Sequence, residues 1–169
     1  MKFLSILLIG TFLLVSCVDR NEISSINPEN WEKRITDIPL EDTLLKGSSY
    51  LSVYSQIYGM TEHRTHDLTV TISMRNTNLR DTVYINKASY YNTEGKLIRT
   101  YFDRSVFLLP METVEIIIDE TDREGGTGAN FVFDWAILPG SNEPYFEAVM
   151  ISTANQQGLS FSTKGIKIK

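Results

Sequence analysis

The chain has 169 residues, of which 42% are hydrophobic and 22% are charged, and it contains a single cysteine. This length fits one globular domain with short appendages, and the ordinary composition excludes collagen, coiled coils and extensive disorder. The formal net charge is −5. An acidic chain argues against binding to nucleic acid, because proteins that bind the phosphate backbone normally present a basic face.

The first 17 residues have the layout of a bacterial lipoprotein signal. Lys2 gives a positive start, and the apolar run from Phe3 to Val15 is shorter than the roughly 20 residues of a membrane-spanning helix. The run ends in Leu14-Val15-Ser16-Cys17, which resembles the lipobox. The resemblance implies that residues 1–16 are a signal peptide and that Cys17 carries acyl chains such as palmitate. An ordinary secretory signal is the alternative.

Residues 17–47 are predicted to be the acylated N-terminus and a tether, because they contain few large apolar residues in any regular period. A one- or two-turn helix is possible through Arg34, with Trp31 packing on the domain or near lipid headgroups rather than binding a ligand. Val18 follows Cys17, where an Asp favours inner-membrane retention of enteric lipoproteins. We therefore expect a protein of the cell envelope, lipid-anchored at the outer membrane and facing the periplasm or the cell surface.

Residues 48–169 are predicted to form one all-β domain. Apolar and polar residues alternate with a period of two, which is typical of strands that bury one face, and Gly, Pro and Asn mark turns between them. The alternation in the fifth strand is broken only by Ile117. Eight strands are expected, at residues 48–58, 68–76, 82–91, 96–102, 112–119, 129–137, 145–153 and 158–168.

This pattern favours an antiparallel β-sandwich of about eight strands and immunoglobulin-like size. The Cys…Trp…Cys pattern of antibody domains is absent, so the likeness is architectural. A small closed barrel is the alternative.

The most specific segment of the domain is Gly125-Gly126-Thr127-Gly128-Ala129-Asn130-Phe131, which is followed by Trp135. Together with segments such as Tyr54–Tyr58 and Leu68–Thr77, it resembles the bacterial family named domain of unknown function 3124. The resemblance covers roughly residues 48–166. It implies a secreted or lipid-anchored bacterial protein with one domain, and it implies no activity and no catalytic residue. Gln56 stands where a His is expected in that family, so no role of that His can be transferred.

Two histidines are candidate metal ligands. His63 and His66 lie in a polar loop, with Glu62 and Asp67 beside them, and imidazole and carboxylate groups together can bind Zn²⁺. The chain has no third His, and its one Cys is assigned to lipid. A solvated loop is the simpler interpretation.

An acidic stretch precedes the glycines. Asp119 and Asp122 belong to residues 119–124, whose carboxylates could bind Ca²⁺. The spacing does not match an EF-hand loop, and Arg123 opposes a cation. The sequence therefore predicts a charged loop, and we expect no cofactor.

Tyr50, Tyr54 and Tyr58 are predicted on one face of the first strand, where they could stack on sugars or on a partner. The alternative is that they cover the outer face of a sheet, since tyrosine is common in strands. Asn130 and Trp135 are further candidate binding residues, and Asn130 is expected to hydrogen-bond the preceding turn.

No nucleophile elbow or Ser-x-x-Lys motif is present. Asp134 and Glu147 lie on polar positions of neighbouring runs and could form the carboxylate pair of a glycosidase, although surface acids on a sheet are far commoner. We therefore expect that the protein is not an enzyme. The predicted role is a membrane-anchored, non-catalytic module that binds or braces an envelope protein or glycan, with loops 59–67 and 120–130 as the regions to inspect. The alternatives are a carbohydrate-binding module and a metal-dependent enzyme.

Overall fold

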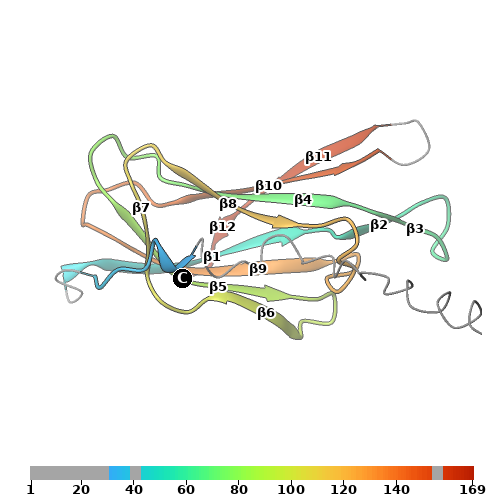
Figure 1. Cartoon of the computed structure of the whole chain (residues 1–169), viewed down its shortest axis with the longest axis horizontal. Coiled ribbons are helices and arrows are strands. Elements are labelled where there is room, and N and C mark those ends of the chain that lie inside the picture. Colours follow the sequence, from blue (N-terminus) through green and yellow to red (C-terminus); the bar gives the residue numbers. More distant parts are fainter. Residues whose placement is uncertain (1–30, 39–42, 154–157) are drawn as a thin grey trace, which may run out of the picture.

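The computed structural model describes residues 31–38, 43–153 and 158–169. In these residues two antiparallel sheets pack face to face as a sandwich, and a two-stranded hairpin extends from one end (Figure 1). The predicted all-β class and sandwich architecture are confirmed, and the alternative of a closed barrel is wrong. No helix in the described part of the chain is long and apolar enough to cross a membrane. Residues 1–30, which include Cys17, lie outside the described residues.

The larger sheet has the order β12-β1-β9-β5-β6, and β7 also pairs with β5. Its central strand β9 pairs along its whole length with β1, from Leu45 opposite Ile137 to Val53 opposite Ala129. The strands of this sheet are β1 (Leu45–Val53), β5 (Val83–Tyr91), β6 (Leu97–Phe102), β7 (Val106–Leu108), β9 (Ala129–Ile137) and β12 (Ile166–Lys167).

The smaller sheet has the order β11-β10-β4-β8, so β8 and β11 are its edge strands. Its strands are β4 (Thr69–Arg75), β8 (Thr113–Ile118), β10 (Tyr145–Ser152) and β11 (Leu159–Lys164). A separate hairpin consists of β2 (Gln56–Tyr58) and β3 (Thr65–Asp67).

The core lies between the two sheets, because each strand places alternate apolar side chains inward. Phe131 and Phe133 of β9 stack with their ring centroids 5.4 Å apart, and Phe133 stacks on Phe146 of β10 at 4.3 Å. This aromatic column joins the two sheets. Burial of each such side chain contributes about 1.5–3 kcal/mol, and a chain with one cysteine has no internal disulfide to add to it.

Six of the eight predicted strands agree with observed strands within one residue at each end. The first predicted strand is wrong in its extent, because β1 begins at Leu45 and ends at Val53, and β2 starts anew at Gln56. The last predicted strand is divided at Gly165 into β11 and β12. Strands β3 and β7 were not predicted, since three residues are too few to show a period.

The segment 31–38 packs on the sandwich, although the sequence placed it in the tether. The Arg34 N–H donates to the Trp31 carbonyl at 2.8 Å, which closes a turn. Ile35 then forms an isolated antiparallel β-bridge with Val106 of β7. Trp31 is buried, and its ring centroid lies 4.8 Å from that of Phe102. The predicted packing of Trp31 on the domain is therefore confirmed.

The loops gather at the two ends of the sandwich (Figure 1). We call one the Asn78 end. There the Met111 N–H donates to the Asn78 carbonyl at 3.1 Å, and the Asn142 N–H donates to the Asn78 side-chain oxygen at 2.7 Å. It consists of loops 77–82, 109–112 and 138–144. We call the other the hairpin end; there Gln56 N–H donates to Gly126 O at 3.1 Å. It consists of residues 59–67, 92–96 and 119–128.

Candidate functional site

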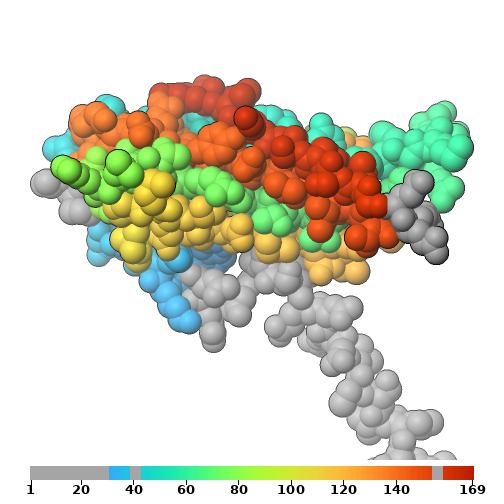
Figure 2. All heavy atoms as spheres, turned by 90° about the horizontal axis from the view of Figure 1, so that it is seen from above, coloured from blue at the N-terminus to red at the C-terminus, as the bar shows by residue number. Residues whose placement is uncertain are grey.

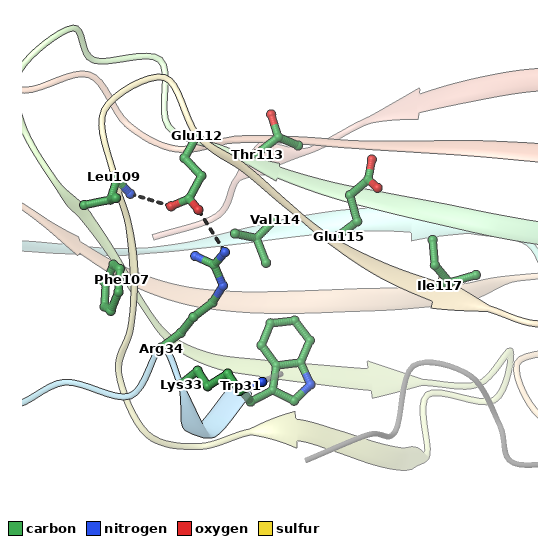
Figure 3. Close-up of a pocket in the computed structure, with 10 residues that line it drawn as sticks. All are labelled: Trp31, Lys33, Arg34, Phe107, Leu109, Glu112, Thr113, Val114, Glu115 and Ile117. Carbon is green, nitrogen blue, oxygen red and sulfur yellow. Dashed lines mark hydrogen bonds and ion pairs between the residues drawn. The ribbon is translucent and has the colours of Figure 1, made fainter. Parts of the chain in front are cut away.

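An open groove of about 590 Å³ runs along one side of the sandwich (Figure 3). One wall consists of the turn at residues 31–34 together with Phe107 of β7. The other wall consists of Leu109, Glu112 and the edge strand β8. The groove therefore lies where the edges of the two sheets face each other, and both apolar and charged side chains line it.

An ion pair crosses the groove near the Asn78 end. The Arg34 guanidinium lies 2.8 Å from a carboxylate oxygen of Glu112, and the other oxygen accepts the Leu109 N–H at 2.8 Å (Figure 3). The hydrogen bond from Arg34 holds the pKa of Glu112 below its ordinary value, against the opposing effect of burial. The pair thus stays charged at neutral pH and fixes segment 31–38 against the turn that precedes β8.

Strand β8 presents an unpaired backbone edge to the groove. Asn76 N–H donates to Glu112 O at 2.9 Å, and hydrogen-bonded pairs alternate along an antiparallel ladder. The backbone groups of Thr113, Glu115 and Ile117 therefore point away from β4. Within the described residues no backbone group pairs with them. All three residues also line the groove.

The opposite wall supplies side chains of a different kind. Trp31 and Phe107 give apolar surface, while Lys33 is exposed and brings a positive charge opposite the exposed Glu115. A concave site with apolar walls and a few polar groups is suited to binding. Together with the open edge of β8, this arrangement can accept an extended chain.

The predicted zinc ligands do not converge. His63 has an exposed side chain whose Nε2 lies 3.5 Å from Glu62, and the His66 ring lies against Gly59. Asp67 is engaged elsewhere, with Gln56 Nε2 at 2.7 Å and Arg123 Nη2 at 2.5 Å. Among the described residues no group of three or more His, Cys, Asp or Glu side chains is placed to hold a metal ion.

The acidic stretch is organised by contacts within the protein. Asp119 accepts both the N–H and the hydroxyl of Thr121 at 2.8 Å, and these bonds lower its pKa. Asp122 is buried and lies 2.9 Å from Arg99 of β6. Burial alone would lower the pKa of Arg99, but the hydrogen bonds to Asp122 and Tyr101 outweigh it and raise the pKa. The carboxylates proposed as calcium ligands thus cap a turn and fasten it to β6.

In the glycine-rich segment, residues 125–128, the backbone passes close to β5. A Cβ on Gly125 would lie 1.9 Å from the Tyr90 hydroxyl. Thr93 fastens the crossing, because its hydroxyl donates to Gly125 O at 3.1 Å and accepts Gly128 N–H at 3.0 Å. The prediction that Asn130 hydrogen-bonds this turn is wrong, since its side chain makes no hydrogen bond to the described residues.

The three tyrosines do not form one ladder. Tyr50 lies on β1 and Tyr58 on β2, while Tyr54 falls in the break between these strands and packs edge-on against Phe161 at 5.8 Å. The prediction of one outward face is wrong, because the chain turns at Ser55, whose hydroxyl donates to Gly126 O at 3.2 Å.

Trp135 lies in the core, and it also lines a second, smaller open pocket of about 280 Å³ together with Gly47 and Asp134. Its side chain is buried, and its indole N–H donates to the Ser49 hydroxyl at 3.0 Å. A Cβ on Gly47, opposite Trp135 on β1, would lie 2.4 Å from the indole ring. Trp135 therefore fills core space against the larger sheet. This packing explains why an apolar residue stands at this point of the alternating pattern, and no ligand is needed to explain it.

The candidate carboxylate pair is separated by the sandwich. Asp134 accepts the Ser48 hydroxyl at 2.6 Å on the larger sheet, and Glu147 lies 3.5 Å from Arg75 on the smaller sheet. Their neighbours Phe133 and Phe146 stack between the sheets, so the two carboxylates point outward on opposite faces. The expectation that they could come close is wrong.

The groove is not predictable from the sequence pattern. Its walls come from residues 31–34, 107–109 and 112–117, and their meeting depends on which strands form the edges of the sheets. One signal was present: Ile117 breaks the alternation of β8, and the structure places it outward on the groove.

Comparison with known proteins identifies the domain. A family model described as protein of unknown function (DUF3124) matches residues 46–168. No curated relative matches the chain. The crystal structure of Thermotoga maritima 1070 is similar, with 9% sequence identity and a TM-score of 0.45 over 71% of this chain and 92% of that chain; a likeness of this degree supports no inference about function. Because the family model covers most of the sequence, the chain belongs to the DUF3124 family of proteins of unknown function.

Proposed function

We propose that this protein is a bacterial envelope lipoprotein that is held at the outer membrane by acyl chains on Cys17. Its sandwich domain binds an extended segment of another envelope protein along β8, and its role is accessory and non-catalytic. The observation that carries the binding role is the groove beside the open edge of β8.

The anchor is supported by the first 17 residues alone. They combine a positive start, an apolar run and the chain's single cysteine at the end of a lipobox-like tetrapeptide. Two or more acyl chains on that cysteine give a stable anchor, because each buried CH₂ group contributes about 0.8 kcal/mol. Cys17 and Trp31 are separated by residues 18–30, so the anchor keeps the domain close to the membrane.

The binding mode is supported by the backbone of β8. An exposed sheet edge is a template for a further strand, in which main-chain hydrogen bonds supply affinity and side-chain contacts supply specificity. Thr113, Glu115 and Ile117 offer those backbone groups. Phe107 on the facing wall, with the small exposed part of Trp31, offers apolar contacts to alternate side chains of a bound strand.

The other two candidate functions have less support. A carbohydrate-binding module needs aromatic side chains on one platform, and Tyr50, Tyr54 and Tyr58 lie on different elements. A metal-dependent enzyme needs converging ligands, and the described residues contain no group of three or more His, Cys, Asp or Glu placed to hold a metal ion. Both remain alternatives to the proposed protein-binding role.

The groove is tested by photocrosslinking in the native cells, with a photoreactive residue in place of Lys33 in the full-length protein. We expect one discrete adduct with an envelope protein. Glu115→Pro should remove it, because proline has no N–H and obstructs a pairing strand. The matched control Glu115→Ala loses the same carboxylate but keeps the N–H, and should retain the adduct.

The absence of a Lys33 adduct, or an equal yield from the Pro and Ala variants, would contradict strand addition at β8. Thermal unfolding of each variant shows whether the domain is intact. If Glu115→Pro does not fold, Thr113→Pro gives the same test, because its N–H also points away from β4.

A further inference from the structure

The three loops of the Asn78 end form one connected surface. Asn78 links them through Met111 and Asn142, and its amide donates to Asn142 O at 3.0 Å and to Asn76 Oδ1 at 2.9 Å. Asn76 in turn donates to Leu108 O at 3.0 Å. Because Asn76 and Asn78 are both buried, the loop tips are held on a fixed polar base.

Large apolar side chains project from this base. Leu79 is 80% exposed, Met111 64%, Leu109 51% and Leu138 44%. They come from all three loops, which lie side by side at the left of Figures 1 and 2. Isolated exposed apolar residues are ordinary, but a group of them on adjoining loops marks a surface that contacts a protein or a membrane.

The carboxylates of this end have partners. Glu112 pairs with Arg34, Glu143 lies 2.5 Å from Lys167 Nζ, and Asp81 accepts the Ser141 hydroxyl at 3.0 Å. Arg80 next to Leu79 is exposed. Few negative charges near the apolar loop tips are therefore left without a partner.

The hairpin end also exposes apolar side chains, such as Tyr58, but it differs in charge. Its loops 59–67, 92–96 and 119–128 contain seven acidic and three basic residues. Although Met60 is 90% exposed there, the surrounding carboxylates are repelled by the anionic surface of a bilayer. The two ends of the sandwich therefore differ in charge, and an anionic bilayer repels the Asn78 end less.

The chain enters the domain beside the Asn78 end. Arg34 is bound to Glu112, which closes the turn that carries Leu109 and Met111. Residue 31 is fourteen residues after Cys17, and a chain of that length reaches at most about 50 Å. A lipid anchor at Cys17 thus keeps the apolar tips within reach of the bilayer.

We propose that the Asn78 end rests on the lipid surface that holds the Cys17 acyl chains, with Leu79, Leu109, Met111 and Leu138 at the interface. This inference depends on the proposed lipid anchor. It orients the domain with the acidic hairpin end away from the membrane and with β8 running outward from the bilayer.

The test uses the full-length acylated protein reconstituted in vesicles of phosphatidylethanolamine with a minority of phosphatidylglycerol. Lipid occupies the only native cysteine, so Leu79→Cys and Met111→Cys each add one thiol for an environment-sensitive fluorophore. We expect both labels to shift to shorter emission wavelength and to be quenched by nitroxide-labelled lipids. Met60→Cys is the matched control on the hairpin end and should stay in water.

Equal quenching at positions 60, 79 and 111, or none at 79 and 111, would overturn the inference. Shielding of 79 and 111 in cell envelopes but not in pure lipid vesicles would also overturn it, in favour of a protein contact. Flotation of the same vesicles separates the two proposals. If the protein floats with the vesicles but its labels remain exposed to water, only the lipid contact is disproved. If the protein does not float, the anchor is disproved as well.

Discussion

At the scale of single residues, Gly125 shows how the most specific sequence motif of the chain works. The position is buried, and any side chain there would meet the Tyr90 hydroxyl. Tyr90 is itself fully buried, and this burial raises the pKa of its hydroxyl above the ordinary value. The motif is therefore explained by packing of the hairpin end and not by a bound phosphate or metal ion.

Gly125→Ala should lower the free energy of unfolding by about 1–3 kcal/mol, because Tyr90 and its neighbours must shift to admit a methyl group. Gly158→Ala is the matched control, since a Cβ there meets nothing within 4 Å, and it should change stability by less than about 0.5 kcal/mol. Urea unfolding of both variants measures the difference. Equal stability of the two would contradict the close crossing at Gly125.

At the scale of elements, loop 119–128 is held to β6 by a buried ion pair. The exposed fraction of the side chain is 1% for Asp122 and 13% for Arg99, so solvent screens this pair little. Glu124 also pairs with Arg99 at 3.1 Å, but its side chain is 58% exposed. Both carboxylates contact the same guanidinium, but water screens the Glu124 pair much more than the Asp122 pair.

Asp122→Ala should lower the free energy of unfolding by about 3 kcal/mol, because it leaves Arg99 buried with only an exposed partner. Glu124→Ala, which removes the exposed partner, should cost no more than about 1 kcal/mol. Thermal unfolding of the two variants compares them directly. A larger loss from Glu124→Ala would show that the buried pair does not fasten the loop.

The sequence predicted the strands that bury one face, because a period of two over six or more residues is a local property. The break between β1 and β2 could not be predicted, since Tyr50 to Tyr58 continues the same alternation. It arises from bonds between Ser55, Gln56 and Gly126, about 70 residues away in sequence. The groove could not be predicted either, because the edge position of β8 is set by strand order.

At the scale of the whole molecule, the domain is a sandwich with two different ends and one open side. The acylated N-terminus would hold the domain at the membrane, the Asn78 end would rest on lipid, and β8 would offer its edge to a partner. The family identity supports none of these roles by itself. They rest on the first 17 residues, on the exposed apolar loop tips and on the groove.

The most direct test of this account is the intact mass of the protein extracted by detergent from its native membranes, with fragmentation of its N-terminus. We predict a mature chain that begins at Cys17 and carries a thioether-linked diacylglyceryl group, with or without an acyl chain on the new amine. A Cys17→Ser variant should lose this modification and leave the membrane fraction. A chain that starts elsewhere, or that begins with an unmodified Cys17, would contradict the anchor and every orientation derived from it.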